Sequence, residues 1–173
     1  MKISILSLIA ALSLCLSASA AEKSAKISRV HLCCKSCVRG VEKAVATVPG
    51  AKAEVDADNR TVTLSGPDTA TVKKAADAMV KAGYFGESSD PAVTLHANSG
   101  AKGEKVHKLT VEGVHLCCAK CVKAADKAVK SVPGTAEHTA TKGAESFEIT
   151  GDFNDKDIFT ALQKEGLTGK AAK

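Results

Sequence analysis

The sequence contains very few aromatic residues. Its 173 residues include no Trp, one Tyr and four Phe, so aromatics make up 3% of the chain. Proteins that bind unpaired nucleic acid by stacking need aromatic platforms, so this composition disfavours that class. The formal net charge of +5 is also too small for a dense phosphate-binding surface. With so few rings, the sequence predicts a core made of Val, Ala, Leu and Ile.

The sequence also lacks the patterns that carry enzyme chemistry. It shows no Ser/His/Asp arrangement, no paired-carboxylate signature and no glycine-rich phosphate loop. Its hydrophobic content of 45% and charged content of 25% are ordinary for a globular chain, long enough for one domain or two small ones. We therefore expect a folded protein that is not an enzyme.

The first twenty residues have the composition of a secretory signal peptide. A positive start is followed by a short apolar run and by the small residues Ala18-Ser19-Ala20. The run is too short to span a bilayer comfortably, and no other stretch is a candidate span. We expect cleavage after Ala20, removal of Cys15 with the peptide, and a periplasmic or secreted protein in which disulfides are chemically permitted.

The rest of the chain contains an internal repeat. Residues 30–50 and 114–134 align without a gap and are identical at 13 of 21 positions. All six remaining cysteines fall at matching places, as do two histidines. The cysteines are Cys33, Cys34 and Cys37 in the first copy and Cys117, Cys118 and Cys121 in the second.

Hydrophobic periodicity predicts the same elements in both copies. In the first, we expect a strand at Ile27, a helix over 38–48, a hairpin over 53–64, a helix over 68–83 and a strand near 84–85. In the second, we expect a strand at 109–111, a helix over 122–132, a weak strand over 136–140, a clear strand at 147–149 and a helix over 154–166. The order β-α-β-β-α-β is that of the ferredoxin-like fold.

These elements define the expected organisation. The fold class is α+β, with two ferredoxin-like βαββαβ sandwiches in tandem. We place the signal peptide at 1–20, the first domain at 21–90, a linker at 91–104 and the second domain at 105–173. Residues 92–95 could extend a strand.

The cysteines lie between a strand and the first turn of a helix. Thiolates bind soft cations, and a helix N-terminus lowers the pKa of a thiol. Two thiols separated by two residues at such a turn can converge on Cu(I), Zn(II), Hg(II) or Cd(II). A single such pair is a weak signal, but its duplication in the same context is a strong one. The expected ligands are Cys34 and Cys37 in the first copy and Cys118 and Cys121 in the second.

Both copies resemble the heavy-metal-associated domain family, which includes copper chaperones and metal-ATPase modules. The matching motifs in the first copy are Cys34-Lys35-Ser36-Cys37, Val48-Pro49-Gly50, Val62-Thr63-Leu64-Ser65-Gly66 and Ala82-Gly83-Tyr84. Those in the second are Cys118-Ala119-Lys120-Cys121 and Val132-Pro133-Gly134. The resemblance implies the ferredoxin-like fold and soft-metal binding by the CxxC cysteines.

Two departures from the family pattern affect the expected site. The family's Met is missing, and each loop carries an additional thiol, Cys33 or Cys117, which favours three ligands over a near-linear pair. The family's Tyr is present as Tyr84, but the second copy has Leu167 there. We expect His31 and His115 to shape the loops or support the ligands, with direct ligation as the alternative.

The sequence thus predicts an exported protein that binds Cu(I) first and hands it to a metal-transporting or metal-accepting partner by ligand exchange. Three alternatives stay open: a disulfide-stabilised module, a redox-active module, and a buffer that only sequesters metal. Basic residues beside each loop, such as Lys35 and Arg39, are expected to lie on a solvated face and could steer an acidic partner.

Overall fold

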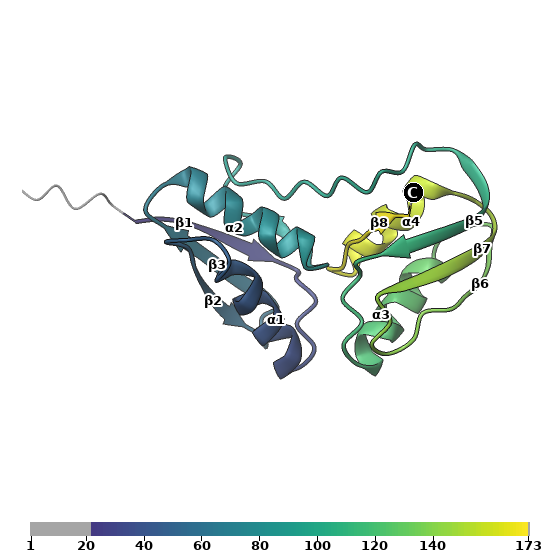
Figure 1. The fold of residues 1–173 in the computed structure, drawn as a ribbon, viewed down its shortest axis with the longest axis horizontal. Helices are drawn as coiled ribbons and strands as arrows, with labels where there is room; N and C mark the ends of the chain where they lie inside the picture. The colour runs from purple at the N-terminus through teal and green to yellow at the C-terminus, as the bar shows by residue number, and fades with distance from the viewer. Residues whose placement is uncertain (1–21, 173) are drawn as a thin grey trace, which may run out of the picture.

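The computed structural model describes residues 22–172, so the expected signal peptide lies outside the described residues. Figure 1 shows two α/β halves side by side, joined by a long segment that crosses from one to the other. We call residues 22–88 the first half and residues 105–172 the second half. Among residues 22–172, none of the helices is long and apolar enough to span a bilayer.

Each half contains an antiparallel sheet of four strands and two helices. The first half comprises β1 (Lys23–Ser28), α1 (Lys35–Val45), β2 (Lys52–Asp56), β3 (Thr61–Gly66), α2 (Thr69–Lys81) and β4 (Glu87–Ser88). The second comprises β5 (Lys105–Glu112), α3 (Ala119–Lys130), β6 (Thr135–His138), β7 (Ser146–Asn154), α4 (Asp155–Lys164) and β8 (Lys170–Ala171). The strand orders are β2-β3-β1-β4 and β6-β7-β5-β8. The α+β class is confirmed, and the element order is consistent with the ferredoxin-like arrangement.

The periodicity of the sequence explains these elements. In β3 the buried residues alternate with partly exposed ones, while α1 buries Cys37, Val41 and Val45 along one face. Two of the helices begin at side-chain caps. Asp68 accepts a hydrogen bond from the amide of Thr71 at the start of α2, and Asn154 accepts one from Lys156 at the start of α4.

Two local predictions differ from the structure. The last strand of the first half, expected to begin near 84–85, begins at Glu87 as β4 (Glu87–Ser88), and Tyr84 forms an isolated antiparallel bridge with Leu167 of the second half. Residues 92–95 are not a strand, although Val93 and Leu95 are buried. Both differences arise from packing that local patterns do not encode.

The core consists mostly of Val, Ala, Leu and Ile, as expected, but it also contains aromatic rings. Tyr84, Phe147, Phe153 and Phe159 are all fully buried and are among the largest side chains of the core. Aromatic rings bury more apolar area than any other side chain, so even a few contribute a large share of the core. Three of these four rings lie in the second half.

The connecting segment is fixed to the second half by a buried carboxylate. Asp155, at the start of α4, accepts hydrogen bonds from the amides of Lys102, Gly103 and Glu104 at 2.9, 2.8 and 3.0 Å. Burial acts to raise the pKa of this carboxyl, but the amide donors outweigh it, so the pKa is lowered.

Replacing Asp155 with alanine is expected to destabilise the second half by about 2 kcal/mol, because three amides lose a charged acceptor. In the unmodified chain this stabilisation is present above the unfolded-state pKa of about 3.9 and is lost as the pH falls through the lower folded-state value. Denaturant unfolding between pH 7 and pH 3 measures both effects. The matched control is Asp157→Ala, an exposed acidic residue in the same helical turn. Equal stability of the two variants at pH 7 would contradict the prediction.

Candidate metal centre

Two corresponding loops face each other between the halves (Figure 1). They are residues 29–34, between β1 and α1, and residues 113–118, between β5 and α3. Cys34 and Cys118 are the N-cap residues of α1 and α3. The positive ends of both helices are therefore directed at the cysteines, which favours thiolate over thiol.

The structure brings all six cysteines into one cluster. Within each half, the Sγ atoms of the CxxC pair lie 3.7 Å apart. The contacts between halves are as short: 3.3 Å for Cys33 and Cys118, 3.8 Å for Cys34 and Cys117, 3.6 Å for Cys33 and Cys121, 3.7 Å for Cys37 and Cys117, and 3.9 Å for Cys37 and Cys121. The sequence suggested one ion in each half, whereas the structure places both sets of thiols at a single centre.

The six sulfurs have the neighbour relations of an octahedron. Each lies within 4.8 Å of four others and is separated from the one at the opposite corner. In the part of the chain that the structure describes, three pairs of cysteines make no sulfur–sulfur contact and occupy opposite corners. These pairs are Cys33 with Cys117, Cys34 with Cys121 and Cys37 with Cys118. Every pair of opposite corners therefore has one sulfur from each half.

All six cysteines are free thiols in the structure. A disulfide has its sulfurs about 2.05 Å apart, and the contacts here are 3.3 to 3.9 Å. Three thiolates around one metal, with bonds of about 2.3 Å, have sulfurs about 4 Å apart. The spacing is thus close to that of metal-bridged thiolates.

The surroundings lower the pKa of two of these thiols and raise the pKa of three others. Hydrogen bonding to Cys121 lowers the pKa of Cys37, and it raises the pKa of Cys121 in return. Burial raises the pKa of Cys33, and it raises that of Cys117 to about 12.

Cys118 is the acidic thiol of the second half. Burial acts to raise its pKa, but hydrogen bonds from the Cys121 amide and the Cys33 thiol outweigh burial, and the pKa is about 6. Cys37 and Cys118, the two thiols whose pKa is lowered, occupy opposite corners of the octahedron.

Tyr84 links α1 of the first half to the loop 113–118 of the second. Its hydroxyl donates a hydrogen bond to the carbonyl of Cys37 at 3.1 Å and lies 2.9 Å from Nε2 of His115 in the second half. The rings of Tyr84 and His115 are also in contact, with centroids 4.6 Å apart. His115 thus joins the loop of the second half to the first half, and its role in metal binding stays a prediction.

His31 occupies the corresponding place in the first half but has no such partner. Leu167 stands where a tyrosine would provide a hydroxyl, and Nε2 of the buried His31 has no hydrogen-bond partner among the described residues. One of its ring nitrogens lies within 4.8 Å of the sulfurs of Cys33 and Cys121. Burial lowers the pKa of His31, so it is neutral near pH 7 and able to offer a nitrogen lone pair.

Backbone contacts beside the loops join the two halves. The amides of His31 and Phe85 donate to the carbonyl of Gly166 at 3.3 and 3.1 Å, and the amide of Thr168 donates to the carbonyl of Gly83 at 3.0 Å. Gly83 and Gly166 have φ of +85° and +77° and lie directly against the opposite loop. The sequence analysis did not assign these glycines to the site, although both directly precede the matched pair Tyr84 and Leu167.

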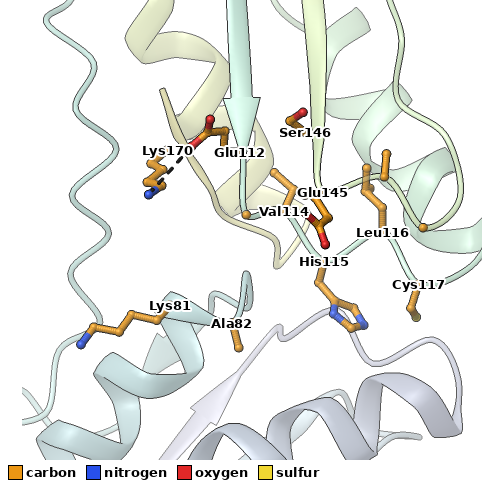
Figure 2. A pocket seen from close by; sticks show the side chains of 13 residues that line it. Lys81, Ala82, Glu112, Val114, His115, Leu116, Cys117, Glu145, Ser146 and Lys170 are labelled. Carbon is orange, nitrogen blue, oxygen red and sulfur yellow. Dashed lines mark ion pairs between the residues drawn. The ribbon is translucent and has the colours of Figure 1, made fainter. Parts of the chain in front are cut away.

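An open cavity of about 750 Å³ lies beside the cluster, between the end of α2 and the end of β5 (Figure 2). His115 and Cys117 extend from the second half toward the first along its edge. Its charged lining residues are Lys81, Glu112, Glu145 and Lys170, and Glu112 and Lys170 form an ion pair at 3.9 Å. The cavity gives solvent a direct approach to Cys117.

The remaining histidines are separate from the centre. His96 and His107 are exposed. His138 is only partly exposed, because its Nε2 lies 2.9 Å from a carboxylate oxygen of Asp126.

The fold and the thiol cluster fit a metal-binding module. Residues 27–85 match the family described as "Heavy-metal-associated domain" and form such a domain. The chain is also 33% identical over 147 residues to "Copper-transporting ATPase 2" of Rhizobium meliloti (strain 1021), covering 81% of this chain and 15% of that protein. It is 34% identical over 116 residues to "Copper-transporting ATPase 1" of the same organism, covering 65% of this chain and 12% of that protein.

The chain therefore spans only a small part of these curated relatives. Among solved structures, the "Solution structure of the N-terminal soluble domains of Bacillus subtilis CopA" aligns with 88% of this chain and 95% of that chain. The sequence identity is 18% and the TM-score is 0.31.

Proposed function

We propose that this protein binds a thiophilic metal ion, Cu(I) in the first place, through the thiolates of its two CCxxC loops and passes it on by ligand exchange. The observation that carries the proposal is the convergence of six free thiols within one contact network. The similarity of the chain to parts of two copper-transporting ATPases supports copper as the metal. Zn(II), Hg(II) and Cd(II) favour the same soft ligands and are the competing cargoes.

Transfer would proceed through shared ligands. An incoming ion meets one partly exposed thiolate, is captured by neighbouring sulfurs, and leaves when a partner's cysteines replace them one at a time. The exposed basic residues Lys35, Arg39 and Lys120 lie close to the loops in sequence and would favour an acidic metal-accepting partner.

The test is a Cu(I) titration of the purified, reduced chain against a competing chelator, with thiols counted before and after. Replacing Cys34 and Cys118 together with serine is expected to lower Cu(I) affinity by about 100-fold or more, beyond the 10–100-fold that loss of a supporting residue costs. Ser36→Ala, at an exposed position in the same helical turn, is the matched control and should bind as the unmodified chain does. Failure of the reduced chain to take up Cu(I) would refute the proposal.

The same preparation separates this function from its alternatives. Thiols that are permanently oxidised as isolated would favour the disulfide-stabilised module, and reversible oxidation without metal uptake would favour the redox-active one. A chaperone also transfers its ion to an acceptor faster than free dissociation allows, whereas a buffer does not.

We further propose that the protein is exported by residues 1–20 and acts in the periplasm or outside the cell. The basis is the composition of that segment. N-terminal sequencing of the native protein should then give Ala21 as the first residue, and a chain that retains Met1 would contradict export by cleavage.

A further inference from the structure

We propose that the six thiols form one cage that binds up to four Cu(I) ions as a single polynuclear cluster shared by both halves. This inference rests on the proposed function, because it presupposes that the thiols bind Cu(I). It differs from one ion per half in its stoichiometry, its metal–metal distances and its dependence on the contact between the halves.

The arrangement of the sulfurs provides four matching sites. An octahedron has two sets of four alternate faces, and all eight triads here lie within 4.8 Å; we assign the ions to one set. The triads of this set are Cys33 with Cys34 and Cys118; Cys34 with Cys37 and Cys117; Cys117 with Cys118 and Cys121; and Cys33 with Cys37 and Cys121. Every sulfur belongs to two of the triads, so every thiolate bridges two ions and each ion has three sulfur ligands.

The dimensions agree with three-coordinate metal. Nine of the twelve neighbouring pairs of sulfurs are 3.3 to 3.9 Å apart and the other three lie within 4.8 Å, so the cage is close to the edge of about 4 Å set by bonds of about 2.3 Å. The centres of alternate faces are separated by two-thirds of the edge, which places neighbouring ions about 2.7 Å apart for bonds of that length. Three of the four triads combine thiols from both halves, so the cluster requires the halves to stay in contact.

Charge and burial support the same site. Six thiolates and four Cu(I) ions leave a net charge of only −2, and the N-termini of α1 and α3 face that charge. His31 is a second, independent indication of a ligand. It is 9% exposed, its Nε2 has no partner among the described residues, and a ring nitrogen lies within 4.8 Å of two sulfurs of the fourth triad.

The experiment is anaerobic Cu(I) loading of the full chain, read by native mass spectrometry and by X-ray absorption. We expect species with about four ions per chain to accumulate cooperatively, together with copper–copper scattering near 2.7 Å, the separation set by bonds of about 2.3 Å. Two ions per chain without copper–copper scattering would overturn the shared cluster and leave the proposed function intact. Absence of Cu(I) binding would remove both.

A single-cysteine variant separates the two arrangements further. Cys118 contributes to two triads, so Cys118→Ser is expected to lower the uptake from four ions to two or fewer. If each half instead bound its own ion, the same change would leave the ion of the first half in place. Only one of the two bound ions would then be lost. Ser36→Ala changes a residue of the first CCxxC loop without removing a thiol, so it is the control and should retain four ions. Circular dichroism of the metal-free variant confirms that a loss of copper does not reflect unfolding.

Discussion

A chain saturated with Cu(I) is expected to melt about 10 °C or more above the metal-free chain. A ligand that binds only the folded state stabilises it by about 4 kcal/mol at a free concentration 1,000 times its dissociation constant. For a chain of this size each kcal/mol raises the melting temperature by about 2–4 °C. Differential scanning calorimetry with Cu(I) buffered by a chelator measures the shift.

The shape of the transition is the more specific result. Because the cysteines of both halves form one centre, bound Cu(I) should make the halves unfold in a single transition. The variant with Cys34 and Cys118 replaced by serine should lose most of the shift, and Mg²⁺, which prefers oxygen ligands, should produce none. A copper-bound chain that melts in two separate steps would show that each half holds its own metal.

Most of the fold could be predicted because each element has its own periodic pattern and its own capping or terminating residues. The buried alternation around Leu109 and Val111, the cap at Asp68 and the Pro49-Gly50 stop are all local features. The candidate ligands could be predicted as well, because the repeated cysteine motif fixes which residues share a loop.

The meeting of the two loops could not be predicted from the same patterns. It depends on backbone hydrogen bonds to Gly83 and Gly166 and on the bridge between Tyr84 and Leu167, none of which leaves a periodic signal. A hint was present in the sequence, since a glycine follows the second helix at the corresponding place in each copy. The different roles of His31 and His115 likewise depend on which residue the opposite half supplies.

The chain's dependence on that contact can be tested without altering any sulfur. A Cβ added to Gly83 would lie 2.5 Å from the carbonyl oxygen of Gly113 and 2.6 Å from the amide nitrogen of His115. One added to Gly166 would meet the carbonyl oxygen of Arg29 and would lie 2.5 Å from the amide nitrogen of His31. Real Cβ atoms do not approach backbone so closely, so the two loops must separate.

Replacing Gly83 and Gly166 together with alanine is therefore expected to divide the six thiols into two groups of three. Copper uptake should fall from about four ions to about two, and copper–copper scattering should be lost, while each half keeps its CxxC pair. Gly100→Ala is the matched control, because Gly100 has φ of +70° but a Cβ there meets nothing within 4 Å. It carries the same left-handed strain, which costs about 1–2 kcal/mol, without a clash between the loops. If the double variant still bound about four ions with copper–copper scattering, the metal cluster would not depend on the glycine contacts that join the halves in the structure.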